Sequence, residues 1–490
     1  MSQLLALHRA ARIVGVSRGE LQKKIKVGAL RSSEGLISTE DLLAAYPETK
    51  FQEDLIAEHF ARLKDEAFAK RVREHVLPDK EVLAARLYEQ SRELADVRNH
   101  LQRYHSVLVR MQEQVQQMGK IAGANDLAIA ALDDWLNSQL EEVLNTEAPD
   151  PLSVMDDYLR VVSAQVILRP SGHEFFVEGS DTILEAALRA GLALNYGCSN
   201  GNCGLCKARV VSGQIQKVRH FDYVLSEAEK NMGYALMCCH APVTDLTIEA
   251  LEAAGPSDIP QQEIKTRVKS VHSLKEDLML LHLQTPRTNR LRFLAGQRVA
   301  LSSEDAAPTE FGVASCPCDD RNLQFHVRNT PGNKFAERVF HGLKNGDTVT
   351  VRGPFGSFVL REDSPRPLLF IACDTGFAPI KSLIEHAMAL DVAETMHLYW
   401  FSAFPSGHYQ ANLCRSWTDA LDNFHYTEVS VSSLAQDEIH SSIQTIADKG
   451  PTLTEFEVYV AGPEAFVTAA RGWLTERGLP EVQLALEIIQ

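Results

Sequence analysis

The sequence lacks any long apolar run. Its most hydrophobic stretch, residues 368–372, is soon followed by Asp374, whereas a membrane-spanning helix needs about 18 or more uncharged apolar residues. The N-terminal segment contains His8, Arg9 and Arg12, where a secretory signal needs a continuous apolar core. We therefore expect a cytoplasmic protein without a membrane span.

Cysteine is also scarce. The chain has nine cysteines among 490 residues, and none of them lies in the first 197. A disulfide-stapled secreted protein spreads many cysteines through a short chain, so this class is excluded. Four of the nine have the spacing of ligands.

Basic residues are outnumbered by acidic ones. The chain has 49 Lys and Arg against 65 Asp and Glu, for a formal net charge of −16. This balance argues against a protein coated in nucleic acid, although it leaves room for one local basic patch. The hydrophobic content of 45% and the charged content of 23% are ordinary globular values. At roughly one to two hundred residues per domain, the length predicts three or four folded domains.

Residues 5–47 predict a small helix-turn-helix domain, which we bound at 1–48. Ser17 and Glu20 have the spacing of a capping box before the second helix, and Ser38 precedes Asp41 in a similar pattern. The second helix carries lysine at positions 23, 24 and 26. The segment resembles the helix-turn-helix of MerR and excisionase-type DNA-binding domains. Small folds of this kind also dock onto proteins, so DNA and protein are both open as partners.

Residues 49–160 predict a helical region with a coiled coil. Apolar residues recur every seven positions, with a second series three residues behind: Leu87, Leu94, Leu101, Leu108 and Val115, then Val97, Tyr104, Met111 and Met118. A stripe of two apolar residues in seven suits a two-helix seam. We favour a homodimer, and the alternative is an intrachain hairpin against residues 50–75 or 127–145. The prolines of the segment 145–153 end this region.

The C-terminal two-thirds of the chain predicts three further domains. Residues 164–252 read as strands around a Ser171–Gly172 turn and then one helix, with Asp181 as N-cap and Gly191 as C-cap, before a cysteine cluster. Residues 262–362 are rich in short strands, as in an antiparallel β-barrel. Residues 363–490 alternate apolar strands with helices, as in a doubly wound α/β domain.

The strongest chemical signal is the spacing of three cysteines, Cys198, Cys203 and Cys206, followed at a distance by a fourth. This C-x4-C-x2-C pattern matches the plant-type [2Fe–2S] arrangement, in which three thiolates come from one loop and one from a separate segment. Glycines at 197, 201 and 204 allow the loop to wrap closely around a cluster. A zinc site would need a second C-x2-C or spaced histidines, which do not follow here.

Two adjacent cysteines, Cys238 and Cys239, compete for the fourth position. The segment LMCCHAPVTDLTIE resembles the closing segment of plant-type ferredoxins, in which the ligand lies four residues before a proline. That resemblance selects Cys238, because Pro242 is the proline, and it implies an α+β β-grasp ferredoxin fold.

The order of cluster, barrel and doubly wound domain makes residues 165–490 resemble the ferredoxin–NAD(P)H reductase family. The subgroup is the one with an N-terminal ferredoxin domain, which includes oxygenase reductases and CDP-6-deoxyglucoseen reductase-like proteins. The strings that carry the resemblance are LRFLAGQ, RGPFGSF, DTGFAPIKS and VYVAGPEAF. The family passes a hydride from NAD(P)H to a flavin on the barrel, and then single electrons through the cluster to a partner protein.

Several positions that touch flavin in the family are changed here. The Arg-x-Tyr-Ser motif falls on residues 309–312, which read Thr-Glu-Phe-Gly just before Val313. A bidentate cation for the pyrophosphate is therefore missing, although Phe311 retains an aromatic ring for the isoalloxazine. The second phosphate element loses its hydroxyl but keeps Gly332 and Lys334. The resemblance leaves FAD binding open.

The nicotinamide half has changed in the same way. The Gly-Gly-Thr-Gly loop reads Cys-Asp-Thr-Gly at residues 373–376, so that Thr375 and Gly376 remain beside a new carboxylate. The family's Cys-Gly-x-Pro-like segment keeps Gly462 and Pro463 but has Ala461 in place of the cysteine. A carboxylate next to a pyrophosphate repels it, so NAD(P)H binding is in doubt.

Three functions are consistent with these observations. The first is a [2Fe–2S] electron-transfer protein of the reductase family, a degenerate reductase that exchanges single electrons with a protein partner. The second is a redox-responsive DNA-binding regulator with the cluster as sensor, and the third is an adaptor subunit of a larger complex. We favour the first. Whether it works as an NAD(P)H-dependent oxidoreductase is open, and we assign no catalytic residue.

Overall fold

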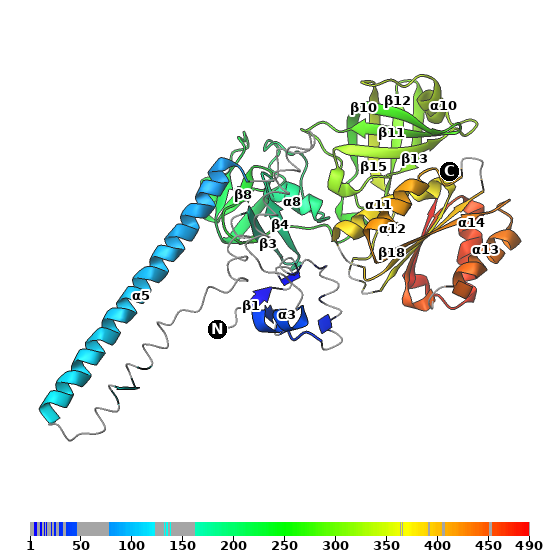
Figure 1. Cartoon of the computed structure of the whole chain (residues 1–490). Coiled ribbons are helices and arrows are strands. Elements are labelled where there is room, and N and C mark those ends of the chain that lie inside the picture. The colour runs from blue at the N-terminus through cyan, green and yellow to red at the C-terminus, as the bar shows by residue number, and fades with distance from the viewer. Residues whose placement is uncertain are drawn as a thin grey trace.

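The computed structural model describes most of the chain. The described residues are 78–122 and 162–489, apart from 363, 365, 391–392, 404–406 and 450–452, together with 4–6, 10–11, 14, 16, 21, 24–25, 29–32, 36–46, 132, 134–135 and 138. An N-terminal unit, a long helix and three sheet-containing domains follow one another along the chain (Figure 1). No helix in these ranges is long and apolar enough to cross a membrane.

The N-terminal unit contains two short antiparallel strands, β1 (Leu4–Ala6) and β2 (Leu36–Ser38), and the helix α3 (Thr39–Ala45). The Ser38 hydroxyl accepts a hydrogen bond of 3.0 Å from the Asp41 N–H, which confirms the cap that the sequence predicts. The strand pair was not predicted, because three-residue strands leave almost no periodicity in a sequence. The capping box at residues 17–20 and lysines 23 and 26 lie outside the described residues.

Lys24 is one of the three lysines in the second helix of the predicted helix-turn-helix. Its ammonium donates a hydrogen bond of 3.2 Å to the Ala45 carbonyl and lies 3.7 Å from the centroid of the Tyr46 ring. A cation at the C-terminal end of a helix is stabilised by the free carbonyls there. The ammonium of Lys24 therefore has partners within the N-terminal unit.

The helix α5 (Lys80–Ala122) extends from the ferredoxin domain as a long arm (Figure 1). The apolar residues of its heptad stripe are mostly exposed: Leu87, Leu94, Val97, Leu101, Tyr104 and Met111. The helix itself is thus as the heptads predict. Residues 50–75 and most of 127–145, the segments proposed for an intrachain hairpin, lie outside the described residues.

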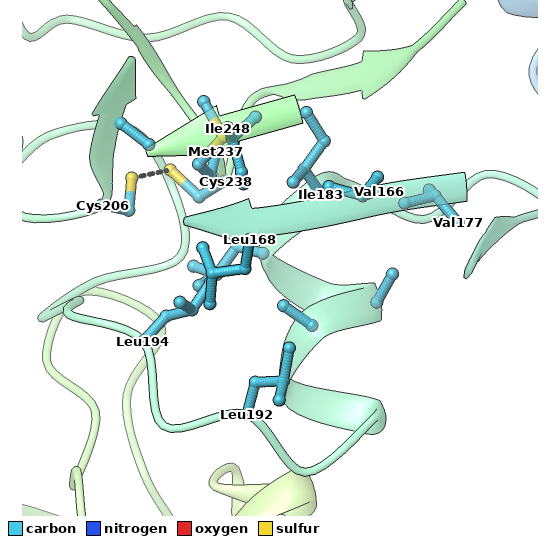
Figure 2. Close-up of a cluster of buried hydrophobic side chains, with 14 of the residues drawn as sticks. Val166, Leu168, Val177, Ile183, Leu192, Leu194, Cys206, Met237, Cys238 and Ile248 are labelled. Carbon is cyan, nitrogen blue, oxygen red and sulfur yellow. Dashed lines mark hydrogen bonds between the residues drawn. The ribbon is translucent and has the colours of Figure 1, made fainter. Parts of the chain in front are cut away.

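The ferredoxin domain has a five-stranded mixed sheet in the order β4-β3-β9-β5-β7. The strands are β3 (Ser163–Arg169), β4 (Glu174–Glu178), β5 (Lys207–Ser212), β7 (Tyr234–Leu236) and β9 (Leu246–Glu249). A second, two-stranded sheet pairs β6 (Ile215–Lys217) with β8 (His240–Pro242), and the helices are α8 (Ile183–Arg189) and α9 (Glu227–Asn231). The core lies between α8 and the sheet, with the Cys206–Cys238 pair at its edge (Figure 2).

The cap of α8 corrects one detail of the sequence prediction. Thr182, not Asp181, is the N-cap, and its side chain accepts a hydrogen bond from the Glu185 N–H within a capping box. The Asp181 carboxylate instead forms an ion pair with Arg189. Aspartate and threonine both cap helices well, so the sequence alone does not show which of these two adjacent residues is the N-cap. Gly191 follows the last turn with φ of +84°, as a helix-ending glycine does.

The next domain is a six-stranded antiparallel sheet in the order β13-β12-β15-β10-β11-β14. Its strands are β10 (Gln262–Lys275), β11 (Leu278–Gln284), β12 (Arg298–Ser303), β13 (Ala306–Gly312), β14 (Asn322–Arg328) and β15 (Thr348–Phe355). The helix α10 (Lys334–His341) contributes Phe335, Ala336 and Val339 to the same core. This is the small barrel that the strand-rich sequence predicts.

The last domain is a parallel sheet in the order β18-β17-β16-β19-β20. Its strands are β16 (Leu368–Cys373), β17 (Met396–Ser402), β18 (Phe424–Ser430), β19 (Glu457–Gly462) and β20 (Leu484–Ile488). Its helices are α11 (Phe377–Leu390), α12 (Ala411–Ala420), α13 (Gln436–Lys449) and α14 (Glu464–Glu476). The doubly wound fold is confirmed, and ligands of such folds bind beyond the carboxyl ends of the strands.

Candidate functional site

The four cysteines predicted as ligands lie together as two pairs. The Cys206 thiol donates to Cys238 with 3.1 Å between the sulfurs, and both side chains point toward one another in Figure 2. The second pair is Cys198 and Cys203, whose side chains are hydrogen-bonded. Cys198 also interacts electrostatically with both Cys206 and Cys238, so the pairs are close to each other. Three loop cysteines and one distant cysteine thus meet as the spacing predicts.

The loop around Cys198 directs backbone N–H groups at sulfur. Burial by itself would raise the pKa of the Cys198 thiol, but hydrogen bonds from the N–H groups of Asn200, Cys203 and Asn202 bring it below its ordinary value. The Leu205 N–H likewise donates to Cys203 Sγ over 3.5 Å. Such donors stabilise a thiolate and any negative charge added to a cluster on reduction.

Gly204 shows why this loop needs glycine. Its φ is +74°, and a Cβ atom there would lie 2.3 Å from the Tyr223 ring. A larger residue would therefore be strained twice, by its backbone and by the ring. The position confirms the expectation of a tightly wrapped loop.

The pairing of the thiols distinguishes two kinds of metal centre. A structural zinc takes four ligands around one ion, whereas a [2Fe–2S] cluster places two thiolates on each of two irons. Across the described residues, no three His, Cys, Asp or Glu side chains converge on a single metal position. Two adjacent pairs of thiols fit the two-iron cluster.

The resemblance to plant-type ferredoxins selects Cys238, and not the adjacent Cys239, as the fourth ligand. The Cys239 sulfur lies 3.6 Å from that of Cys238 and is packed close to Gly201, where a Cβ atom would be 2.7 Å from it. Cys238, in contrast, faces Cys206. The geometry favours Cys238 as the fourth ligand.

The cluster loop is held against the barrel by Arg290, which the sequence analysis did not single out. Its backbone N–H donates to Gly197 O over 2.9 Å, and its guanidinium donates to Ser199 Oγ and to the Asp320 carboxylate, both over 3.0 Å. The residue is only 7% exposed. A buried cation beside Cys198 stabilises the reduced, more negative form of a cluster. No local pattern marks Arg290, because its partners lie far away in the sequence.

Asp320 completes this connection. Tyr196 donates a hydrogen bond to the carboxylate, and burial raises the pKa of Asp320 to about 6 although Arg290 opposes the shift. The group joins a barrel loop to the residue two positions before Cys198. The ferredoxin domain and the barrel are therefore connected through buried polar groups as well as through the linker.

On the barrel, the positions predicted for the flavin pyrophosphate do come together. The Thr309 hydroxyl donates to Asn333 Oδ1 over 3.4 Å, and Asn333 itself caps α10 by accepting from the Ala336 N–H. Gly332 lies in the open with φ of +83°, and Lys334 is exposed. The only cation at this helix end among the described residues is thus an exposed lysine, where the family has a bidentate arginine. The site does not fit a pyrophosphate in the family's manner.

Phe311 is partly buried and packs into the barrel core. Its ring centroid lies 5.7 Å from that of Phe335, a fully buried residue of α10. Val313 is also buried in this core. The structure therefore gives both predicted cofactor residues a packing role.

The other face of β13 meets the C-terminal strand across a cavity of about 460 Å³. Arg298 lines it and forms ion pairs with Glu310, at 2.6 Å, and with Glu487, at 2.9 Å. Apolar residues of α14 and of the chain end complete the wall: Val467, Leu486, Ile488 and Ile489. Arg471 also lines the cavity and pairs with Glu481 at 2.8 Å, so both arginines of the cavity are already paired with carboxylates.

Hydrogen bonds join the barrel and the α/β domain beside this cavity. The buried Lys381 and Ser382 side chains of α11 donate to the carbonyls of Ala314 and Ser315 over 3.0 and 2.7 Å. At Gly312, where the family has a serine, a Cβ atom would lie 3.0 Å from Pro379. The two domains are therefore in close contact at this position.

In the α/β domain, the predicted dinucleotide-binding loop contains the buried carboxylate of Asp374. Asp374 is 1% exposed and has φ of 49°, a conformation that usually requires glycine. Its carboxylate accepts hydrogen bonds from Ser402 Oγ over 3.3 Å and from the Ala403 N–H over 3.4 Å, and its carbonyl accepts from Trp400 Nε1 over 3.2 Å. Burial raises the pKa of Asp374.

Aromatic side chains pack next to Asp374 in the core of the α/β domain. Phe377 and Trp400 stack with ring centroids 4.0 Å apart, and Tyr409 meets Trp400 edge-on at 4.9 Å. Tyr409 also shares a hydrogen bond of 2.9 Å with His326 of the barrel. These side chains come from α11, β17, β14 and the turn before α12, and they join the barrel to the α/β domain near the carboxyl ends of the strands.

The remaining predicted cofactor residues serve close packing. A Cβ atom on Gly376 would lie 2.1 Å from the Ala461 carbonyl, and one on Gly462 would lie 2.8 Å from Cys373. Thr375 is buried, and Pro463 directly precedes α14. They allow the ends of β16 and β19 to lie close together.

Three domain families match this chain in the order that the fold shows. The 2Fe-2S iron-sulfur cluster binding domain matches residues 166–244, the oxidoreductase FAD-binding domain 265–360 and the oxidoreductase NAD-binding domain 370–472. The protein therefore belongs to the ferredoxin reductase family, in the group that carries its own iron–sulfur domain.

Two relatives support the same family, and one solved structure is also similar. The chain is 31% identical over 326 residues to CDP-6-deoxy-L-threo-D-glycero-4-hexulose-3-dehydrase reductase of Yersinia pestis, which covers 65% of this chain and 96% of the relative. It is 28% identical over 331 residues to the propane 2-monooxygenase reductase component of Rhodococcus jostii (strain RHA1), covering 65% and 90%. A solved ferredoxin reductase in carbazole 1,9a-dioxygenase is 22% identical, with a TM-score of 0.42, and covers 67% of this chain and 99% of its own.

Proposed function

We propose that this protein transfers single electrons between a [2Fe–2S] cluster and a protein partner, and that its NAD-binding-type domain is a scaffold which does not take NAD(P)H. The ligands of the cluster are Cys198, Cys203, Cys206 and Cys238. Their arrangement as two adjacent pairs supports this set. Relatives named as reductases of a dehydrase and of a monooxygenase support a protein as the electron partner.

The observation that carries the scaffold role is the buried carboxylate of Asp374 in the predicted dinucleotide loop. Asp374 places a buried carboxylate where a pyrophosphate would lie, and hydrogen bonds hold it there. The ring of Trp400 donates to the Asp374 carbonyl and stacks on Phe377, which fixes the loop in place. A dinucleotide pyrophosphate at this loop would meet a fixed negative charge, so the residues do not fit it.

The flavin site supports the same interpretation. The pyrophosphate position has an exposed lysine, and Arg298, a partly exposed arginine of the nearby cavity, is paired with two glutamates. Phe311 is turned into the barrel core. We therefore derive no electron-transfer step through a flavin.

A reduction experiment tests the proposal. The visible spectrum of anaerobically purified protein should show an oxidised [2Fe–2S] cluster that dithionite bleaches and that excess NADH or NADPH leaves unchanged. Acid extraction of the same sample should release no stoichiometric flavin. Bleaching by either nucleotide, in proportion to the nucleotide added, would overturn the scaffold role.

We also propose that α5 pairs with α5 of a second copy. Its apolar stripe from Leu87 to Val115 spans about 42 Å at the rise of an α-helix. The seven-residue period runs from Leu87 to Val115, which is longer than the roughly three heptads that a coiled coil needs, and its leucines at 87, 94 and 101 are exposed. A self-complementary partner suits a stripe that repeats without interruption.

The variant Leu94→Glu/Leu101→Glu tests the dimer. It should sediment as a monomer, because two like charges would face each other in the seam. The control is Asn99→Glu/Ser106→Glu, which adds the same charges on the opposite face of the helix and should sediment like the wild type. A wild-type monomer, or a dimer that survives the leucine substitutions, would contradict the proposal.

A further inference from the structure

Two cysteines outside the iron–sulfur site lie one residue apart, on a barrel loop. Cys316 and Cys318 flank Pro317, and Cys316 Sγ accepts a hydrogen bond of 3.3 Å from the Cys318 N–H. Both are free thiols. Cys316 is 3% exposed, whereas Cys318 is only partly buried. The pair thus combines an accessible sulfur with a shielded one.

The position of this loop in the fold is distinctive. The short helix η2 (Pro317–Asp319) contacts α8 of the ferredoxin domain and α11 of the α/β domain. The Cys316 N–H donates to the Glu385 carboxylate of α11 over 3.3 Å. Asp320, which follows η2, pairs with Arg290 beside the cluster loop. The thiol pair therefore lies where the three C-terminal domains meet.

The two thiols differ in reactivity because each acts on the other. The Cys316 thiol donates a hydrogen bond to the sulfur of Cys318, which lowers the pKa of Cys318 although burial, Glu385 and Asp319 oppose the shift. The same hydrogen bond, together with burial, raises the pKa of Cys316. The accessible sulfur is therefore the one that loses its proton first. A thiolate next to a second thiol is the arrangement of redox-active cysteine pairs.

We propose that Cys316 and Cys318 form a redox-active dithiol that a peroxide oxidises to an intramolecular disulfide. The Cys318 thiolate attacks one oxygen of hydrogen peroxide, an S–O bond forms, the O–O bond breaks and hydroxide leaves. The Cys316 sulfur then attacks Cys318, the S–S bond forms, the S–O bond breaks and water leaves. Overall, two thiols and one peroxide give one disulfide and two waters, so the dithiol is oxidised by two electrons.

The spacing permits this bond. Disulfide formation needs Cα atoms within about 7 Å, a limit that residues separated by a single proline in a tight turn satisfy. The proposal does not depend on the cluster or on the fate of NAD(P)H. Its failure would leave the proposed electron-transfer function untouched.

Peptide mapping of the full-length protein provides the test. Trypsin releases residues 299–321, a peptide that contains Cys316 and Cys318 and no other cysteine. After a brief exposure to one equivalent of hydrogen peroxide and alkylation of free thiols, this peptide should be two hydrogens lighter than its reduced form and unalkylated. Dithiothreitol should restore both alkylation sites. The buried thiols of Cys373 and Cys414 serve as internal controls that stay reduced.

Two variants assign the roles within the pair. In Cys316→Ser, Cys318 should accumulate sulfenic acid that dimedone traps, because the resolving thiol is gone. In Cys318→Ser, dimedone labelling of Cys316 should be at least about tenfold lower, since that sulfur is buried and protonated. A wild-type peptide that stays reduced, or that gains oxygen without forming the internal disulfide, would overturn the proposal. The mass of the wild-type peptide does not depend on whether the variants fold.

Discussion

The hydroxyl of Ser402 donates a hydrogen bond of 3.3 Å to the carboxylate of Asp374 and thereby joins the ends of two parallel strands. In this fold such strand ends usually frame a ligand. Here the polar group that meets the strand ends belongs to the chain itself. Asp374 therefore replaces a ligand contact by a structural one, in a backbone conformation with φ of 49° that suits glycine better.

Two substitutions at this position separate the backbone strain from the hydrogen bonds. Asp374→Gly and Asp374→Ala both lose the contacts to Ser402 and Ala403, but only alanine keeps a side chain in the left-handed conformation. We expect the alanine variant to be less stable than the glycine variant by about 1 kcal/mol. Urea unfolding of both variants measures this difference, and equal midpoints would show that the conformation is not strained.

His326 predicts a pH dependence of stability. Burial, together with the nearby Lys381 ammonium, lowers its pKa to about 3, against an ordinary value near 6.5. The unfolded chain therefore binds more protons between pH 3 and 6.5, and the free energy of unfolding falls as the pH drops through this window. We expect a loss of about 1.4 kcal/mol between pH 7.5 and 5.5 from this group.

The variant His326→Gln isolates that contribution. It removes the titrating ring at the contact with Tyr409 and leaves every other ionisable group in place. The difference in unfolding free energy between pH 7.5 and 5.5 should be smaller in the variant than in the wild type by the amount given above. An unchanged pH dependence would show that His326 is protonated to the same extent in both states.

Iron content distinguishes Cys238 from its neighbour. Cys238→Ala should lose most of the iron and acid-labile sulfide, because one iron would keep a single thiolate. Cys239→Ala should retain both, since that sulfur packs against Gly201 rather than facing Cys206. Iron bound at wild-type level in Cys238→Ala, together with its loss in Cys239→Ala, would reverse the assignment.

Arg86 links the long arm to the ferredoxin domain. Its guanidinium is 2% exposed and donates two hydrogen bonds, of 3.2 and 3.0 Å, to the carbonyl of Pro242. Arg86→Met should release the first turns of α5, with a loss of about 1–3 kcal/mol in docking free energy. Faster hydrogen exchange in residues 80–90 would report it.

Arg92→Met is the matched control for that experiment. Arg92 lies on the same helix, is mostly exposed and pairs with Glu89 at 3.1 Å. An exposed pair contributes little, so its removal should leave exchange in residues 80–90 nearly unchanged. Equal effects of both substitutions would mean that Arg86 does not hold the arm.

The sequence by itself determined the parts of this protein that depend on local spacing. The C-x4-C-x2-C loop with its glycines predicted the thiols that meet, and the seven-residue period predicted α5. Alternation of apolar strands and helices predicted the parallel sheet, because each element carries its own periodicity. The eroded cofactor motifs were also visible, since they are substitutions at known offsets.

Only the tertiary structure decided what those substitutions do. The sequence predicts that the charge of Asp374 repels a phosphate. In the structure, its carboxylate accepts hydrogen bonds from Ser402 at the end of β17 and from Ala403 just after it. The aromatic cluster, the Arg290 connection and the docking of Arg86 unite residues that are tens to more than a hundred positions apart. Local patterns carry no record of such contacts, because the packing of whole domains, and not the spacing within one element, brings those side chains together.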